Sequence, residues 1–421
     1  MRTEVAVVGL GPVGGVLASL LAAAGVDVTV VEPTTDVFPV PRAVALDDEV
    51  LRFLASVPAL PPVQTVGRPR AELVTGGGRL IAAMDFDGAR NGHPGLGFFH
   101  QPTLESQLRS LLDGRVLADA VVSIHQAADD VELRLVSGST LTARYVVGCD
   151  GASSTVRGSQ SVAFPGRTLP RPWLVVDAVG KPIADTFRYV CDPAAPAVSM
   201  PVPGGHRWET MRTGSREYSP HVPVGLTVTR SVEYTFSART AERWRVGRVL
   251  LAGDAAHVMP PFAGQGLGAG LRDVAALWWR LVAALQGVDE LDGYESERRP
   301  HVRAMTRTAL LAGAVVQTRS RPAAVAVRGA LKAAGLTPWF RRGGLRPRDR
   351  RLVPNVRVDV AGDVRRLDGW LPFGEYADLR LTGSRQVAIG DVVGTDLDGW
   401  LLQLLRRRDG AVRVRPDRVL T

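Results

Sequence analysis

Residues 4–32 read EVAVVGLGPVGGVLASLLAAAGVDVTVVE, and this stretch decides the fold. The continuous apolar run at 4–10 is typical of a buried strand, the small residues of 12–25 favour a helix, and 26–32 predicts a second strand. Two parallel strands joined by a helix form the unit that begins a doubly wound sheet. We therefore predict an α/β protein with a Rossmann-like N-terminal sheet.

Three regularly spaced glycines lie at the turn between the first strand and the helix. Gly9, Gly11 and Gly14 form the pattern G-x-G-x-x-G, in which they allow a tight turn, close approach of a pyrophosphate, and close helix packing, respectively. The helix start offers unpaired N–H groups to the anion. Glu32 ends the second strand, where a carboxylate accepts ribose hydroxyls and disfavours a 2′-phosphate. The site is predicted to hold FAD or NAD.

Two later stretches place similar turns after buried strands. YVVGCDGASSTVR (145–157) turns at an Asp-Gly pair, which by itself is as typical of a helix cap as of a site. RVLLAGDAAHVMPPFAGQGLGAG (248–270) predicts a strand, then a glycine-rich loop, then a helix from residue 271. Such a loop presents backbone N–H groups and a helix dipole to an electron-rich ligand.

The remaining segments predict further layers. Strand-like runs separated by turn residues over 171–236 favour an antiparallel sheet. After about residue 340 an arginine-rich connector precedes short alternating segments at 356–362, 377–383, 387–393 and 411–417. We interpret these as a small separate C-terminal module.

The composition and charge of the chain argue against several classes of protein. The chain has 421 residues, and its two cysteines, Cys149 and Cys191, supply no disulfide framework, which favours a reducing cytoplasm. No run approaches the roughly 18 apolar residues of a membrane span. The net charge is +9, but no basic motif with interleaved aromatics appears, so we expect no nucleic-acid partner.

Taken in order, the motifs resemble those of FAD-dependent aromatic hydroxylases of the para-hydroxybenzoate hydroxylase type. The resemblance rests on VVGLGPVGG (7–15), VVGCDGASSTVR (146–157) and LLAGDAAHVMPPFAGQGLGAGLRD (250–273), with PRAVALDDEVLRFL (41–54) and HQPTLESQLR (100–109) between the first two. It covers roughly residues 3–320. The chain looks nearest to the branch of 3-(3-hydroxyphenyl)propionate and polyketide hydroxylases, which often end in a thioredoxin-like module with an Arg-Pro-Asp signature, here 415–417.

The resemblance implies a domain division and an activity. It assigns 1–72, 98–170 and 240–330 to a discontinuous FAD-binding domain, 73–97 and 171–239 to an inserted antiparallel substrate-binding layer, and 331–421 to a linker and a short thioredoxin-like remnant. It implies a cytoplasmic monomer or homodimer of secondary metabolism. The implied reaction uses NADH or NADPH and O₂ to hydroxylate a phenolic or polyketide-type substrate through a flavin C4a-hydroperoxide.

Site residues follow by position from the resemblance. Arg42 and Gln101 would contact the phosphate and ribityl region, Asp254 a ribityl hydroxyl, and Asp150 the pyrophosphates, while His257 would be structural. The implied cofactor-binding set is Gly9, Gly11, Pro12, Val13, Gly14, Glu32, Arg42, Gln101, Val121, Asp150, Asp254, Gly264, Gly266, Leu267 and Gly268. The substrate-binding candidates are Arg207, Glu209, Tyr234 and Pro261. Strand alternation sends only half of 206–209 inward, and which half stays open. No catalytic residue is assigned, and no metal is expected.

Three departures from the family pattern bear on the pocket. Gly268 stands where the family usually has Asn, the connection near residues 211–230 lacks a longer helical segment, and the C-terminal module is short. A trimmed lid predicts a more open pocket. That pocket would suit a bulky fused-ring polyketide, or would make a weakened oxygenase that releases peroxide.

Three other functions compete. An NAD-dependent dehydrogenase using only the first motif would leave the other two unexplained. A flavin oxidoreductase of another class, such as a halogenase, usually carries Trp-x-Trp-x-Ile-Pro, whereas Trp278 and Trp279 are adjacent here. A degenerate flavin-binding protein with weak oxygenase activity is the third alternative.

Overall fold

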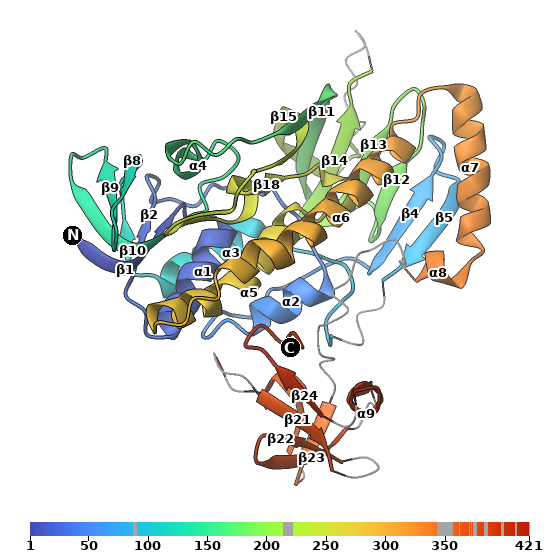
Figure 1. The fold of residues 1–421 in the computed structure, drawn as a ribbon. Helices are drawn as coiled ribbons and strands as arrows, with labels where there is room; N and C mark the ends of the chain where they lie inside the picture. The colour runs from blue at the N-terminus through green and yellow to red at the C-terminus, as the bar shows by residue number, and fades with distance from the viewer. Residues whose placement is uncertain are drawn as a thin grey trace.

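The computed structural model describes residues 1–86, 91–213, 222–342 and, with short gaps, 357–420. Its described part contains three large sheets and one two-stranded pair, β3 (Ala45–Leu46) with β6 (Gly97–Phe98). Two of the large sheets form the main body, and the third forms a C-terminal module beside it (Figure 1). Within the described ranges, the helices are all too short or too polar to cross a membrane.

The first sheet contains the predicted βαβ unit. Strands β1 and β2 pair in parallel and are joined by α1 (Pro12–Ala23), which confirms the α/β interpretation of the N-terminus. The sheet order is β16-β17-β10-β1-β2-β7, with a β8–β9 branch on β10. The strands are β1 (Arg2–Val8), β2 (Val28–Val31), β7 (Val116–Leu117), β8 (Val121–Gln126), β9 (Val131–Leu135), β10 (Thr140–Gly148), β16 (Arg245–Val246) and β17 (Val249–Leu251).

Helix α1 packs between α3 (Gln101–Leu111) and α5 (Gly266–Leu285). Small residues make both contacts close: a Cβ on Gly15 would lie 3.1 Å from Leu108 of α3. Buried aliphatic residues of β1, β10 and α1 form the main hydrophobic core. Further helices of the main body include α2 (Asp48–Ala55), α4 (Thr155–Ser159) and α6 (Asp292–Val316), with short 3-10 turns η1 (Gly253–Ala255) and η2 (Pro261–Ala263).

The start of α5 differs from the prediction. The helix begins at Gly266 and not at residue 271, so Gly266, Gly268 and Gly270 lie inside it. Packing explains the difference, because a Cβ on Gly270 would meet Val13 Cγ2 at 2.8 Å and Gly253 Cα at 3.0 Å. Glycine there permits close contact between two helices, and burial outweighs its weak helix propensity.

The second sheet has the order β18-β15-β11-β14-β13-β12-β4-β5, and its neighbours are antiparallel except β12 and β4. Trp173 and Met211 on one face pack against Phe262 of η2 and Val316 of α6. This contact places the sheet against the loop that follows β17. The strands are β4 (Arg70–Val74), β5 (Leu80–Asp85), β11 (Gly166–Gly180), β12 (Phe187–Val190), β13 (Ala197–Val202), β14 (Gly205–Met211), β15 (Leu226–Thr240) and β18 (His257–Val258).

Residues 331–335 and 338–341 are helical, although the predicted linker begins at residue 331. They belong to α7 (Arg321–Gly335) and α8 (Pro338–Arg341), which lie along β5 (Figure 1). Leu331 and Phe340 pack with Ile81 of β5 in a small apolar cluster. Burying these apolar side chains against β5 is more favourable than exposing them to water in an extended linker. The rest of the expected connector, 343–356, and the lid segment 214–221 lie outside the described residues.

The C-terminal module is a sheet of order β20-β19-β23-β22-β21-β24, and every pairing among its described strands is antiparallel. The segment 387–393, one of the short alternating segments of the sequence, contributes to two strands joined at Gly390. Its φ of 58° suits a tight hairpin turn. The elements are β19 (Arg357–Val360), β20 (Asp363–Arg366), η3 (Leu367–Gly369), β21 (Ala377–Leu381), β22 (Gln386–Ile389), β23 (Val392–Asp396), α9 (Trp400–Arg406) and β24 (Ala411–Val414).

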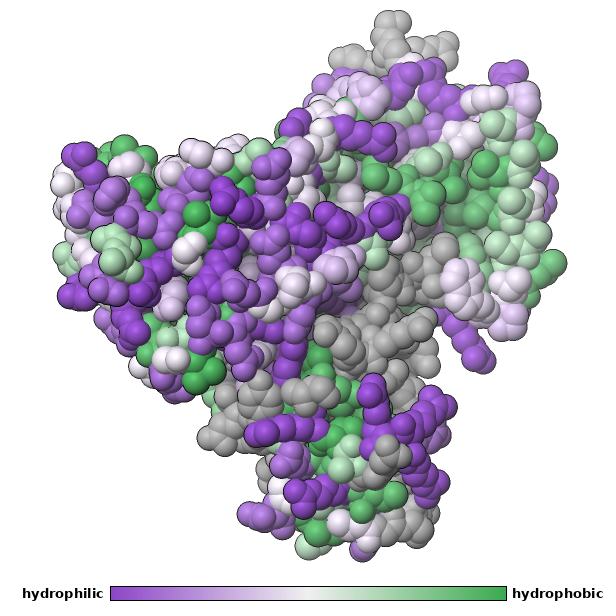
Figure 2. Space-filling view, viewed as in Figure 1, coloured by the Kyte–Doolittle hydropathy of each residue, from purple (hydrophilic) through white to green (hydrophobic). Residues whose placement is uncertain are grey.

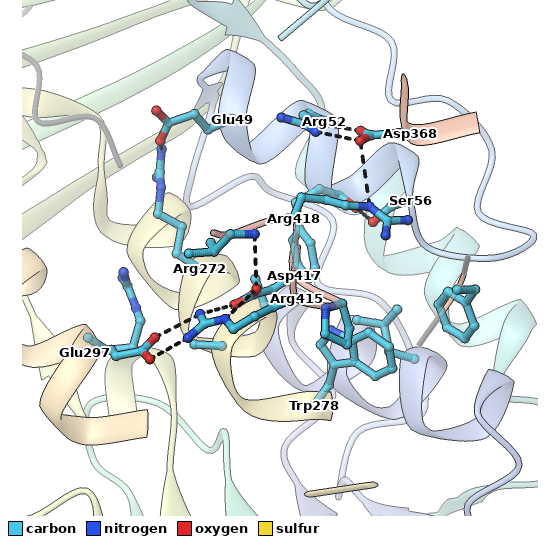
Figure 3. Close-up of a pocket in the computed structure, with 18 residues that line it drawn as sticks. Glu49, Arg52, Ser56, Arg272, Trp278, Glu297, Asp368, Arg415, Asp417 and Arg418 are labelled. Atoms are coloured by element: carbon cyan, nitrogen blue, oxygen red, sulfur yellow. Dashed lines mark hydrogen bonds and ion pairs between the residues drawn. The ribbon is translucent and has the colours of Figure 1, made fainter. Parts of the chain in front are cut away.

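Ion pairs attach this module to the main body (Figure 3). Arg52 of α2 donates to both carboxylate oxygens of Asp368, at 2.6 and 2.5 Å. Arg415 of the Arg-Pro-Asp signature donates to both oxygens of Glu297 on α6, at 2.6 and 3.0 Å. Two bidentate pairs of this kind fix orientation as well as distance.

Acidification is expected to loosen this attachment. Burial of Asp368 opposes its ionisation, but the guanidinium of Arg52 outweighs that effect and lowers the pKa of the carboxyl group. A lowered pKa stabilises the attached state above the ordinary carboxyl pKa of about 3.9, and this contribution is lost as the pH falls through the lower value. Asp368→Asn should mimic the loss at neutral pH by increasing hydrogen exchange in α2.

Asp378→Asn is the matched control, because Asp378 is half exposed and its partner Arg413, 3.9 Å away, belongs to the module itself and not to the main body. It should leave exchange in α2 unchanged. Equal exchange in both variants would show that the Arg52 pair does not hold the module.

Candidate functional site

A cavity of about 310 Å³ lies where the carboxyl ends of β1, β10 and β17 face the second sheet. Ligands of doubly wound sheets bind at this edge. Most of the predicted residues contribute to its wall. The lining is Gly11, Pro12, Val13, Arg42, Ala43, Val44, Ala45, Gln101, Cys149, Gly151, Phe187, Val198, Met200, Arg207, Glu209, Ala252, Gly253, Asp254, Val258, Met259, Pro261, Phe262, Gly264, Gly266 and Leu267.

The first glycine motif surrounds one end of this cavity. Gly9 has a φ of 101°, and a Cβ on Gly14 would lie 2.0 Å from its carbonyl oxygen, so the protein itself requires glycine at both positions. Gly11 differs, because a Cβ there would meet no atom within 4 Å. The N-cap of α1 has no side-chain cap, and no acid lies in its first turn. This bare helix start suits an anion.

Glu32 lies at the end of β2 with its carboxylate fixed by the backbone. Leu10 N donates to one oxygen at 2.9 Å, and Thr34 N donates to the other at 3.0 Å. The backbone N–H of Glu32 donates to the carbonyl of Leu117, and Val121 follows at the start of β8. Neither Glu32 nor Val121 lines the cavity, but Glu32 lies at a strand end beside the glycine turn, where an adenosine would extend.

Asp150 follows β10 and carries an unsatisfied group. Its Oδ2 accepts a hydrogen bond from Val156 N at 3.1 Å, while the buried Oδ1 has no partner in the described structure. Gly9 is adjacent, since a Cβ there would lie 3.0 Å from Asp150 Cα. A buried carboxylate oxygen without a partner is costly, which indicates that a ligand hydroxyl or water satisfies it.

Gln101 and Asp254 face the middle of the cavity. Gln101 Oε1 accepts from Arg42 N and Ala43 N at 3.1 and 2.7 Å, so this side chain holds the 42–43 backbone in the wall. The side chain of Asp254 is accessible from the cavity, yet the surrounding protein desolvates its carboxylate and raises its pKa. Asp254 can accept a hydrogen bond from a hydroxyl group of a sugar-like chain, and the amide nitrogen of Gln101, which donates one N–H to Glu105, can donate the other.

The second glycine stretch lines the cavity only in part. Gly264, with a φ of 61°, ends η2, and Gly266 and Leu267 begin α5 within the wall. Gly268 lies outside the lining, because the first helical turn points it toward α2. A Cβ there would meet Arg272 Nη1 at 3.2 Å and Val50 Cγ2 at 3.4 Å.

The second sheet forms one wall of the cavity, called the sheet floor here, to which Val198, Met200, Arg207 and Glu209 contribute. This wall shows which half of residues 206–209 points inward. Arg207 and Glu209 line the cavity, whereas His206 and Trp208 lie on the opposite face. Pro261 also lines it, but Tyr234 does not. Val198 and Met200 add apolar surface that the sequence interpretation missed, although their spacing of two on one strand is the signal of a shared face.

Arg207 is committed to protein contacts. It donates to both oxygens of Asp177, at 2.6 and 3.0 Å, and to the carbonyls of Pro41 and Arg42 at 2.5 and 3.0 Å. Only 1% of its surface is exposed. It therefore positions the segment that leads to Ala43–Ala45 in the cavity wall.

His257 lies behind the cavity. Its Nε2 lies 2.6 Å from Asp273 Oδ2, which also accepts from Gly253 N at 3.1 Å, while Arg298 donates to Oδ1 at 3.0 Å. The four residues tie α5 and α6 to the turn that carries Asp254. Sequence reasoning missed Asp273, although it ends the third motif.

A second cavity, of about 340 Å³, adjoins the first at Phe262. Tyr189 also lines it, and its hydroxyl donates to the carbonyl of Phe262. Apolar side chains of β4, β5, α6 and α7 make most of its wall, including Leu73, Met84 and Val315. Figure 2 shows hydrophobic residues gathered between α6 and α7.

These features fit FAD. Space beside Gly11 and Gly266, where a Cβ would meet nothing, suits a ligand that approaches the backbone. Glu32 suits ribose, the unpaired Oδ1 of Asp150 suits a hydroxyl or water, and Gln101 with Asp254 suits a ribityl chain. The sheet floor then supplies an apolar surface beside a flat ring system.

The comparisons with known proteins agree. The FAD binding domain family matches residues 2–221 and 205–309. A 3-(3-hydroxy-phenyl)propionate/3-hydroxycinnamic acid hydroxylase from Mycobacterium sp. (strain JLS) is 36% identical over 372 residues, 81% of this chain and 65% of the relative.

Two solved structures share the fold. The p-nitrophenol 4-monooxygenase PnpA from Pseudomonas putida DLL-E4 has a TM-score of 0.74 at 27% identity, covering 82% of this chain and 97% of that one. The OxyS anhydrotetracycline hydroxylase from Streptomyces rimosus has a TM-score of 0.75 at 25% identity, covering 100% and 95%.

The aligned region spans slightly less than two thirds of the mycobacterial relative's own length. The family match includes all three glycine-containing motifs and the sheet floor. The cavity is built from the same matched segments. The chain therefore belongs to the FAD binding domain family.

Proposed function

We propose that the protein is an FAD-dependent monooxygenase that uses NADH or NADPH and O₂ to hydroxylate an aromatic substrate. The observation that carries this proposal is one continuous cavity, in which Gly11, Asp254 and Gly266 face a sheet floor with Val198, Met200 and Glu209. A cofactor cradle and a substrate surface thus share one space. The hydroxylase relatives support the same reaction class.

The residues of the chain would bind and orient the reactants. Asp254 and Gln101 would hold the ribityl chain, and the start of α5 would place backbone N–H groups and a helix dipole beside the ring. FAD, when bound, supplies the redox chemistry. In the overall balance, NAD(P)H provides two electrons, one oxygen atom enters the aromatic ring, and the other leaves as water.

The pocket would also exclude water from the reacting atoms. Phe187, Val198, Met200 and Phe262 give the substrate side an apolar wall. The second cavity beyond Phe262 offers room for a large apolar extension, which favours a fused-ring substrate over a single small phenol. The domain division and the thioredoxin-like remnant given above stay predictions.

The test is NAD(P)H oxidation by the yellow purified protein with a panel of phenols and fused-ring aromatics. We expect the true substrate to accelerate flavin reduction and to yield hydroxylated product in near-equal amount to the NAD(P)H consumed. A degenerate flavin-binding protein would show no reduction with any aromatic. A leaking oxygenase would oxidise NAD(P)H but release mostly hydrogen peroxide.

A further inference from the structure

Glu209 is a buried carboxyl group that faces the cavity without a hydrogen-bond partner among the described residues. It lies on β14, opposite Val175 and Val198 of the neighbouring strands, and is 8% exposed. Burial raises the pKa of this group, with nearby Arg207 opposing the effect. A buried carboxyl group needs a hydrogen-bonding partner. Glu209 lines the cavity, so a ligand in the cavity can supply that partner.

The charges around Glu209 already balance. Arg207 pairs with Asp177 at 2.6 Å, and Arg230 lies 3.7 Å from the same carboxylate. With Glu209 ionised, two arginines therefore face two carboxylates. A further carboxylate brought by a ligand would be uncompensated in a buried site, which is strongly unfavourable.

Arg42 is the other described cation in the lining, and its backbone carbonyl accepts a hydrogen bond from Arg207 at 3.0 Å. Its residue is exposed, and its guanidinium lies 5.6 Å from the ring centroid of Phe38. If the proposed function is correct, the phosphates of FAD pair with the guanidinium of Arg42, which is then not available to a substrate carboxylate. The second cavity has no arginine or lysine among its described lining residues.

We propose that the substrate is an uncharged aromatic molecule that donates a hydrogen bond, as a phenolic hydroxyl does, to Glu209, and that carboxylate-bearing aromatics are rejected. This inference rests on the proposed function for placing the substrate in the cavity. It differs from the substrate in the name of the mycobacterial relative, which carries a carboxylate. Glu209 would thus determine specificity by both acceptance and repulsion.

The experiment compares two ligands with the same ring. 3-(3-Hydroxyphenyl)propionate carries a carboxylate, and 3-(3-hydroxyphenyl)propan-1-ol replaces it with a neutral hydroxyl group. Their dissociation constants are measured with the oxidised holoenzyme from the change in flavin absorbance, without NAD(P)H. We expect the alcohol to bind at least about tenfold more tightly, because like charges placed together in a binding site are costly.

Glu209→Gln keeps the size of the side chain and removes its charge. It should reduce the preference for the alcohol by at least about fivefold, since the repulsion of the carboxylate is lost. The control is Glu233→Gln on β15, because Glu233 does not line the cavity and pairs with Arg212. That variant should leave the preference unchanged.

Equal or tighter binding of the propionate to the wild-type protein would overturn the inference, whether or not the Gln variant folds. So would an unchanged preference in a folded Glu209→Gln protein, or a failure of both ligands to bind. The measurement needs no turnover. An enzyme that hydroxylates the propionate efficiently would contradict this inference and leave the proposed function intact. A protein that shows the expected preference but hydroxylates no aromatic would contradict the proposed function and leave the binding preference intact.

Discussion

Replacing Gly11 by alanine is expected to weaken FAD binding at least about tenfold, or ~1.4 kcal/mol, while leaving the apoprotein folded. The protein does not require glycine there, since a Cβ would meet no atom within 4 Å and φ is −72°. The space is needed only if a pyrophosphate approaches the backbone. Flavin fluorescence gives the dissociation constant, and circular dichroism of the stripped protein gives its thermal stability.

Two matched glycine variants make this result specific. Gly14→Ala should damage the fold as well as binding, because its Cβ would lie 2.0 Å from the Gly9 carbonyl oxygen. Gly158→Ala should change neither property, because Gly158 is exposed in α4 and a Cβ there also meets nothing. If Gly11→Ala bound FAD as tightly as the wild-type protein, the pyrophosphate would not lie at this turn.

Replacing Arg207 by methionine is expected to lower the free energy of unfolding by about 3–5 kcal/mol, because it leaves Asp177 buried without its main partner. The nearby Arg230, 3.7 Å from Asp177, favours the lower end of that range. The change also frees the carbonyls of Pro41 and Arg42, so FAD affinity should fall with stability. Urea unfolding and flavin titration measure the two effects.

The double variant Arg207→Met with Asp177→Leu should recover much of the lost stability, since it removes both charges together. Arg70→Met is the control for loss of an arginine on the same sheet. Its pairs with Glu72 and Asp85 are partly exposed, so we expect a loss below about 1 kcal/mol. An equal loss from the Arg70 and Arg207 variants would show that the buried pair has no special role.

The sequence predicted the parts of the site that local chemistry determines. The apolar run before Gly9 and the acid at Glu32 identify a βαβ unit and its ligand edge without tertiary information, and the structure shows that strand pairing. The start of α5 could not be predicted, because the close packing of Gly270 on Val13 of α1 and on the turn at Gly253 joins segments that are distant in the sequence. Local propensity opposes that helix, and tertiary contact overrides it.

The substrate side was harder to predict for a geometric reason. Strand alternation shows that Arg207 and Glu209 share a face, but it does not say which face meets the cavity. That choice depends on the pairing of β14 with β11, whose Asp177 lies opposite Arg207 and comes from 30 residues earlier in the sequence. The ion pair that commits Arg207 to the protein is likewise visible only once those strands are assembled.

The most direct test of the central claim is turnover under isotope-labelled O₂ with mass spectrometry of the product. A monooxygenase predicts one labelled oxygen atom in each molecule of hydroxylated aromatic, formed in proportion to the NAD(P)H consumed. Product without label, or NAD(P)H oxidation that yields only labelled hydrogen peroxide across the whole panel of neutral aromatics, would contradict it.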